Sequence, residues 1–139
     1  MSTRIEKKEE RLEQILEKVI EANSSKIPII VEGKKDKTAL RVLGVTGEII
    51  GAKTGGRSLL SVIQEIEEKQ FKEVILLLDF DKRGKETAQF FKNHLERARI
   101  TPNLKFWAQI ARTVGKEVKD IEGLVAYKET LKRKLSGNP

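Results

Sequence analysis

Two aspartates, Asp79 and Asp81, follow an aliphatic run in the segment "VILLLDFDKRG", residues 74–84. Carboxylates this close together repel one another, and packing alone gives no reason for placing them at the end of a buried segment. A divalent cation bound between them would relieve the repulsion. The chain has no cysteine and a single histidine, so its available ligands are oxygen atoms, which favour a hard cation such as Mg²⁺ or Mn²⁺.

A third carboxylate, Glu32, ends a second apolar run, "IPIIVEG", residues 27–33. In an open parallel sheet, ligands bind beyond the carboxyl ends of the strands. Along an extended segment, Asp79 and Asp81 project to the same side and Phe80 to the other. If the strands at 27–31 and 74–78 are neighbours, we expect Glu32, Asp79 and Asp81 to converge on one cation.

Basic residues and glycines lie beside these acids in the sequence. The cations are candidate contacts for the phosphates of a nucleic-acid backbone, with solvated surface side chains as the alternative: Lys34, Lys35, Lys53, Arg57, Lys82 and Arg83. The glycine loop at 51–56, which precedes Arg57, could also present backbone amides to a phosphate. Gly33 and Gly84 are candidate motif glycines, because a turn from a strand into a helix favours glycine.

Other polar and aromatic side chains allow a structural interpretation. Asp36 falls in the first turn of a predicted helix, where an anion is favoured, and a functional role is the alternative. Asp120 is predicted to cap a helix, with a third metal-side carboxylate from Asp120 or Glu122 as the alternative. His94 is expected to be structural or solvent-facing. Phe106 and Trp107 are expected in the core, with base stacking as the alternative.

The elements that must position these residues alternate along the chain. Helices are predicted around residues 12–20 and at 34–43, 57–69, 85–99 and 121–135, and strands at 27–33, 47–50, 73–81 and 104–110. The strands are apolar on both faces, which is typical of a parallel sheet covered by helices. The sequence therefore predicts an α/β fold: a compact, Rossmann-like parallel sheet of about four strands with helices on both faces, preceded by an N-terminal helix.

Composition excludes several classes of protein. A chain of 139 residues fits one domain with a single core. It has no apolar run of membrane-spanning length and no signal-peptide pattern, and the absence of cysteine fits the cytoplasm. The net charge is +7, and residues 92–139 hold eleven cations against five anions. That surplus favours a polyanionic partner such as nucleic acid, although a solubilising surface is equally compatible with it.

The two acidic motifs together resemble the Toprim domain family. "VEGKKDKTAL" is similar to the glutamate-glycine motif at the end of the first strand, and "LLLDFDKRG" to the Asp-x-Asp motif after the third, about 45 residues later. The resemblance covers residues 27–127 as the Toprim domain, leaving 1–26 as an N-terminal helical extension and 128–139 as the end of the C-terminal helix and a basic tail. The chain looks closest to small stand-alone archaeal Toprim proteins, and is similar to the Toprim domains of ribosomal-RNA maturation nucleases and primases.

This resemblance implies roles for the acidic residues. Asp79 and Asp81 would hold Mg²⁺, and Glu32 would share the metal or act as general acid or base. We expect a metal-dependent nuclease acting on RNA or DNA. Alternatives are a non-catalytic module that binds nucleic acid or a partner within a larger complex, and a nucleotide-binding regulator. A topoisomerase is disfavoured, because the single tyrosine, Tyr127, lies in a predicted helix of a one-domain chain.

Overall fold

The computed structural model describes residues 3–137. Its elements, in chain order, are α1 (Arg4–Ser24), β1 (Ile29–Val31), α2 (Lys34–Val42), β2 (Ile49–Gly51), the 3₁₀ turn η1 (Thr54–Gly56), α3 (Leu59–Glu68), β3 (Glu73–Leu76), α4 (Lys82–Arg97), β4 (Thr101–Asn103), α5 (Lys105–Val114), the 3₁₀ turn η2 (Gly115–Glu117) and α6 (Gly123–Leu135). The predicted α/β class is confirmed. Residues 138–139 of the predicted basic tail lie outside the described residues.

The four strands form one parallel sheet in the order β2-β1-β3-β4. β1 and β3 are direct neighbours, with Ile29 opposite Ile75 and Ile30 opposite Leu76. The backbone pairing continues one step further, because Leu77 N donates to Ile30 O at 2.9 Å. The ends of β1 and β3 therefore lie side by side, as the interpretation of the acidic motifs requires.

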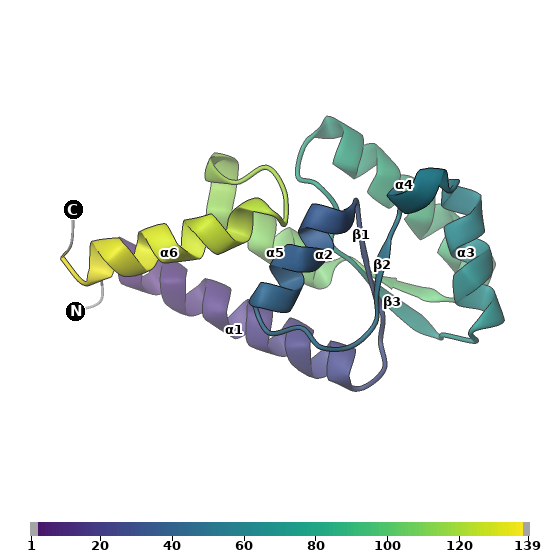
Figure 1. The fold of residues 1–139 in the computed structure, drawn as a ribbon, viewed down its shortest axis with the longest axis horizontal. Helices are drawn as coiled ribbons and strands as arrows, with labels where there is room; N and C mark the ends of the chain where they lie inside the picture. The colour runs from purple at the N-terminus through teal and green to yellow at the C-terminus, as the bar shows by residue number, and fades with distance from the viewer. Residues whose placement is uncertain (1–2, 138–139) are drawn as a thin grey trace.

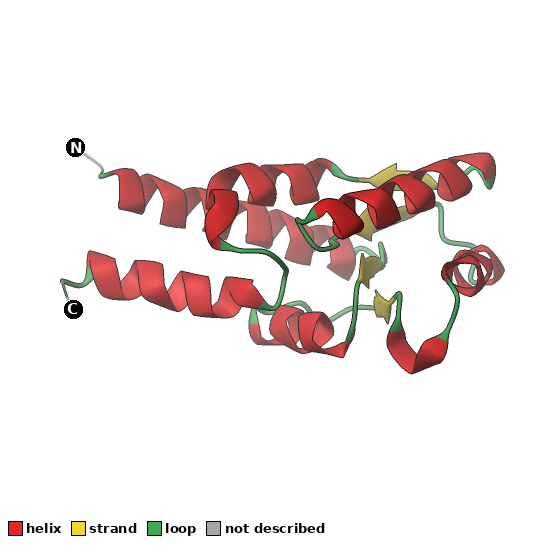
Figure 2. Cartoon of the chain, turned by 90° about the horizontal axis from the view of Figure 1, so that it is seen from above, coloured by secondary structure: helices red, strands yellow, loops and turns green. Residues whose placement is uncertain are grey.

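Helices lie on both sides of the sheet (Figures 1 and 2), and alternate residues of the strands pack into two hydrophobic layers. Ile29 and Val31 face α1, α2, α5 and α6, whereas Ile30 faces the layer formed with α3 and α4. Because strands buried on both faces lose the polar-apolar alternation, β1 and β3 read as continuous aliphatic runs in the sequence. Helices cover both faces of the sheet, as predicted.

Helix α1 is part of the same core. Leu12 and Val19 are completely buried and Leu16 nearly so, and they pack in one cluster with the strands, α5 and α6. At its end the buried Asn23 donates to the carbonyls of Ile27 and Glu48, each at 3.0 Å, and accepts from Gly47 N at 2.7 Å. Helices α1 and α6 extend away from the sheet, with the first turn of α1 and the last turn of α6 at the same end of the molecule (Figure 1).

The prediction of a strand at 104–110 is wrong. Residues Lys105–Val114 form helix α5, and the fourth strand is the short β4 just before it. The buried residues of α5, Phe106, Ile110, Thr113 and Val114, recur at helical spacing, but the pattern emerges only when the window extends past residue 110. Helix α4 also begins three residues earlier than predicted, because Asp81 caps it.

No described helix is both long and apolar enough to cross a membrane.

Candidate metal and nucleic-acid site

Glu32 lies directly after β1 and is 8 % exposed. Its backbone carbonyl accepts a hydrogen bond from Lys53 N at 3.0 Å, so the segment after β2 runs beside it. Its carboxylate forms an ion pair with the same residue, Lys53 Nζ to Glu32 Oε2 at 3.0 Å. The predicted phosphate contact Lys53 is thus bound to one of the predicted metal ligands.

Asp79 is half-buried beyond the end of β3. Burial is the main cause that raises the pKa of its carboxyl from 3.8 to about 7, and the charges of Glu32, Asp36, Asp120 and Asp81 raise it further. At neutral pH a substantial fraction of Asp79 therefore holds a proton. The acidic residues whose charges raise the pKa of Asp79 come from several parts of the chain.

Asp81 is exposed and is the N-cap of α4. Its Oδ1 accepts a hydrogen bond from Gly84 N at 2.8 Å, which satisfies one of the free backbone donors of the first turn. This capping contact is the structural explanation for an aspartate at this position. Because only one oxygen of the Asp81 carboxylate accepts this hydrogen bond, the other remains available, and capping is compatible with metal binding.

Of the two motif glycines, Gly84 is required by close packing and Gly33 is not. A Cβ on Gly84 would lie 1.9 Å from the backbone oxygen of Asp79, so only glycine lets α4 start this close to the acidic segment. A Cβ on Gly33 would meet no atom within 4 Å, and the Gly33 backbone is extended at φ −151°. Packing within the chain therefore explains Gly84 but not Gly33.

The segment from Leu78 to Asp81 is held by contacts that the sequence did not reveal. Trp107 Nε1 donates to Leu78 O at 2.7 Å, and Phe80 N donates to Lys119 O at 2.7 Å. The rings of Phe80 and Trp107 stack, with centroids 6.3 Å apart. Trp107 therefore positions the acids. The sequence feature that could have indicated this contact is the indole N–H of Trp107, which needs a hydrogen-bond acceptor when the ring is partly buried.

Asp36 is a structural acid in this arrangement. Its carboxylate accepts from Gly33 N at 3.1 Å and from Glu122 N at 3.0 Å, which ties the start of α2 to the start of α6. Burial is the main cause that raises the pKa of Asp36, while these two hydrogen bonds oppose the shift. Asp120 accepts from Gly123 N at 2.8 Å, as a residue capping the start of α6 does. His94 stacks on Phe90 with its Nδ1 2.9 Å from Phe90 O, which is the structural role expected for it.

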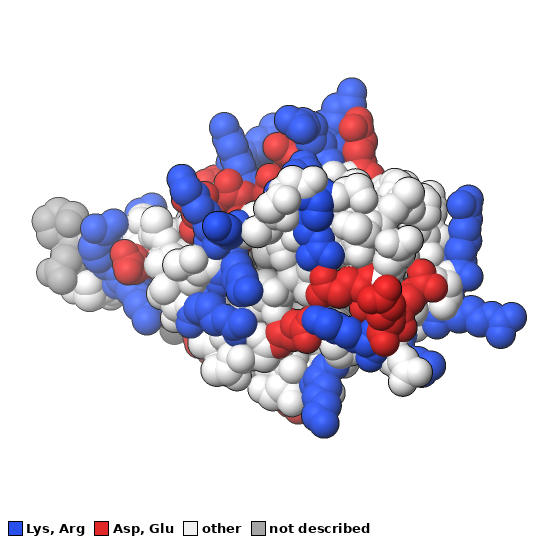
Figure 3. All heavy atoms as spheres, turned by 45° about the vertical axis from the view of Figure 1, so that its right-hand side comes forward, with Lys and Arg blue, Asp and Glu red and all other residues white. Residues whose placement is uncertain are grey.

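The predicted phosphate contacts fall into two groups. Lys34, Lys35, Lys82 and Arg83 are exposed in the first turns of α2 and α4. Arg57 is engaged with Glu65, Nη2 to Oε1 at 2.6 Å, and lines a cavity of about 460 Å³ beside β2 together with Lys34. Figure 3 shows Lys and Arg side chains spread over one face of the molecule, with acidic side chains gathered in groups between them.

The chemistry of the donor set fits a hard divalent cation, because Glu32, Asp79 and Asp81 offer only carboxylate oxygens. Beside burial, the negative charges of Glu32, Asp36, Asp120 and Asp81 raise the pKa of Asp79, and a cation would offset these charges. Within residues 3–137, however, no three His, Asp or Glu side chains already stand grouped as a set of metal ligands. The three acids share one edge of the sheet, with Glu32 turned to Lys53 and Asp81 to Gly84.

Known proteins resemble this chain in sequence and in fold. The Toprim domain family matches residues 27–113. The UPF0292 protein MJ1624 of Methanocaldococcus jannaschii is 41% identical over 86% of this chain and 90% of its own length, and the UPF0292 protein TK1411 of Thermococcus kodakarensis is 35% identical over 83% and 84%. A solved structure of a protein from Aquifex aeolicus superimposes with a TM-score of 0.65 at 26% identity, covering 78% of this chain and 94% of that one.

Proposed function

The chain belongs to the Toprim domain family, and from this premise we propose that it uses Mg²⁺ or Mn²⁺ to hydrolyse phosphodiester bonds of nucleic acid, RNA or DNA. Family membership associates the chain with metal-dependent function on nucleic acid. The observation that carries the finer proposal is the placement of Glu32 and Asp79 just beyond the ends of adjacent parallel strands, where neighbouring negative charges, Glu32 among them, help to raise the pKa of Asp79.

Each acid has a separate task in this proposal. Asp79 and Asp81 would hold the cation, and Asp79 would have to release its proton to do so. Glu32 either shares the cation or transfers a proton to or from an oxygen of the phosphodiester, after Lys53 has left its carboxylate. The cation, when bound, polarises the phosphoryl group and offsets the charge that develops in the transition state.

The exposed cations at the starts of α2 and α4 serve the substrate. Lys34, Lys35, Lys82 and Arg83 lie in the first turns of helices whose N-terminal ends favour an anion. They would hold the phosphates on either side of the bond to be cleaved. Lys53, once released from Glu32, would reach the same backbone.

A second candidate function is a non-catalytic module that holds nucleic acid or a protein partner in a larger complex. The observation that favours it is the ion pair between Lys53 and Glu32, which neutralises one of the three acids with the chain's own ammonium group. In such a module the edge of the sheet would bind its partner without a chemical step.

The test compares cleavage with binding. Labelled RNA and DNA are incubated with the purified protein with Mg²⁺, with Mn²⁺ and with a chelator, and the experiment is repeated with Asp79→Asn. The matched control is Glu96→Gln, which removes an exposed carboxylate from the far part of α4. The nuclease predicts cleavage that requires the cation, disappears in Asp79→Asn and persists in Glu96→Gln.

Binding without cleavage by every protein would reject the nuclease and support the module. Cleavage that persists in the chelator would reject both, because neither assigns chemistry to the metal-free protein.

A further inference from the structure

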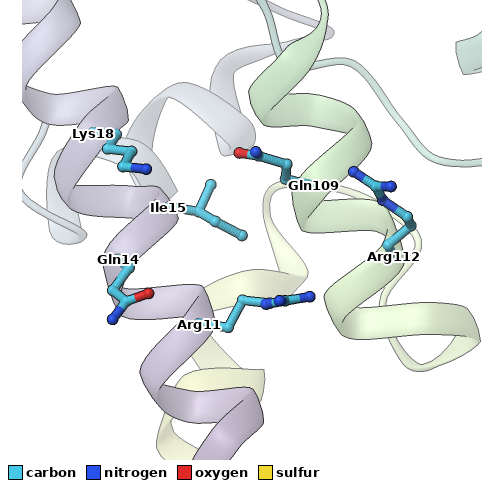
Figure 4. Close-up of a pocket in the computed structure, with 6 residues that line it drawn as sticks. All are labelled: Arg11, Gln14, Ile15, Lys18, Gln109 and Arg112. Carbon is cyan, nitrogen blue, oxygen red and sulfur yellow. The ribbon is translucent and has the colours of Figure 1, made fainter.

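A basic groove runs between α1 and α5, on helices that carry none of the Toprim motif residues. Figure 4 shows its centre, a cavity of about 380 Å³ lined by Arg11, Gln14, Ile15, Lys18, Gln109 and Arg112. A second cavity of about 500 Å³ shares Arg11, Gln14 and Arg112 and extends to Arg4, Lys7 and Lys8. Because the two cavities share lining residues, they form one continuous groove, which we call the α1/α5 groove.

The charges of α1 are sorted by face, although residues 1–26 carry equal numbers of cations and anions. Arg4, Lys7, Arg11, Gln14 and Lys18 recur every three or four residues and form one line along the helix. The acids form another line, on the other flank of the buried stripe: Glu6, Glu10, Glu13, Glu17 and Glu21. A helix built only for solubility gains more from alternating opposite charges at this spacing, so the sorting indicates a surface for an anion.

The central cations of the groove are free of acidic partners. Among residues 3–137, Arg11, Lys18 and Arg112 form no ion pair within 4.0 Å, whereas Lys8 is paired with Glu117 at 3.4 Å. Within the described part of the chain, Glu10 is the one acid that lines either cavity of the groove. In Figure 4 the Arg11 side chain reaches from α1 toward α5, and the Gln109 side chain reaches from α5 toward α1.

Gln109 adds an independent sign of a missing partner. Its Oε1 is buried in the groove wall and has no hydrogen-bond partner within the described residues. A buried amide oxygen without a hydrogen-bond partner destabilises the fold, so such atoms are usually satisfied by water or a ligand. The groove thus combines unpaired cations with amide groups that can donate and accept hydrogen bonds.

We propose that the α1/α5 groove binds the phosphodiester backbone of nucleic acid, as a contact separate from the acidic edge of the sheet. The choice of nucleic acid as the polyanion rests on the proposed function. From Arg4 to Lys18 the line of cations on α1 is about 21 Å long at 1.5 Å per residue, which corresponds to about six steps of 3.4 Å along one strand of a duplex. The chain thereby grips its substrate with its own N-terminal helix.

The experiment measures binding in a chelator, where cleavage does not interfere. Fluorescence anisotropy gives the affinity for single-stranded RNA and for DNA of the same sequence over a range of salt concentrations. The test variant is Arg11→Gln/Lys18→Gln/Arg112→Gln, and all three side chains are exposed, so folding is retained. The matched control is Lys72→Gln/Lys92→Gln/Arg97→Gln. It removes the same charge from the residue before β3 and from α4, which covers the other face of the sheet.

The groove variant is expected to bind at least about tenfold more weakly, and the slope of log affinity against log salt should fall by about 2, since each lost phosphate contact on a single strand removes about 0.7. The control should keep most of its affinity and slope. Equal losses in the two variants, or no binding by the wild type at low salt, would overturn the proposal.

The same assay separates this proposal from the proposed function. Asp79→Asn should keep the salt slope of the wild type in the chelator while losing metal-dependent cleavage. Groove-dependent binding by a wild type that never cleaves would reject the nuclease and leave the groove intact. If the groove variant binds as tightly as the wild type and still cleaves, the groove proposal is rejected and the nuclease is retained.

Discussion

At the scale of single residues, the account depends on a proton and a cation competing for Asp79. The folded protein holds the Asp79 proton more tightly than an unfolded chain does, because the pKa rises from 3.8 to about 7. The stability that this proton contributes is fully present below pH 3.8 and is lost as the pH rises to about 7. A cation at the site would restore that loss by neutralising the same charges.

Replacing Asp79 with asparagine is therefore expected to stabilise the metal-free protein at about pH 8 and to change little at about pH 4. The gain at high pH should be on the order of 1 kcal/mol, since solvent screens a carboxyl that is only partly buried. Thermal unfolding in a chelator measures it. Added Mg²⁺ should then stabilise the wild type but not the variant. A variant less stable than the wild type at the higher pH would contradict the assigned pKa.

Two substitutions of Asp81 separate capping from metal binding. Asp81→Asn keeps an oxygen that can accept from Gly84 N, so its stability should match that of the wild type. Asp81→Ala removes the cap and should cost about 1 kcal/mol in chemical denaturation. Both variants should lose metal-dependent activity, because both remove the charge. Full activity in Asp81→Asn would show that Asp81 is a cap and nothing more.

At the scale of elements, the sequence predicted the helices and strands that show a clear local pattern of apolar residues. The aliphatic runs identified β1 and β3, and the acids that follow them mark the candidate site at this edge of the sheet. The stretch at 104–110 was misassigned because seven apolar-rich residues fit a strand as well as two turns of a helix. Contacts between distant segments could not be predicted from the sequence. Asp36 accepts a hydrogen bond from Glu122, 86 positions away, and Trp107 donates one to Leu78, 29 positions away.

The start of α4 provides a test of how elements position the acids. Gly84→Ala should move the backbone of Asp79, because the new Cβ would lie 1.9 Å from its carbonyl oxygen. We expect a loss of about 1–3 kcal/mol in unfolding free energy and weaker Mg²⁺ binding by calorimetry. Gly33→Ala is the matched control, since its Cβ would meet no atom within 4 Å and stability should be retained. Equal stability in both variants would refute the close approach seen at Gly84.

At the scale of the whole molecule, α1 links the fold to the proposed binding surface. The apolar residues of α1 pack into the core, and the cations beside them on the same helix line the α1/α5 groove. The sequence predicted this helix but treated residues 1–26 as an extension of a domain at 27–127. Its packing against α5 and α6 is a tertiary contact that periodicity alone does not reveal.

Removing residues 1–24 is expected to prevent cooperative folding. Leu12, Leu16 and Val19 are buried against the rest of the protein, and burying each such side chain contributes about 1.5–3 kcal/mol. Their combined loss is comparable to the whole stability of a typical domain, about 5–15 kcal/mol. Circular dichroism during urea titration checks this. A truncated chain that unfolds in a sharp transition at the wild-type midpoint would show that α1 is dispensable.

The most direct test of the central claim is the anomalous scattering of Mn²⁺ in crystals of the protein grown near pH 8, where Asp79 is mostly deprotonated if its pKa is about 7. The account predicts a peak at the ends of β1 and β3, bound by Asp79 with Glu32 or Asp81, with Lys53 displaced from Glu32. Crystals that retain the Lys53–Glu32 ion pair and show no manganese at this edge under saturating metal would contradict it.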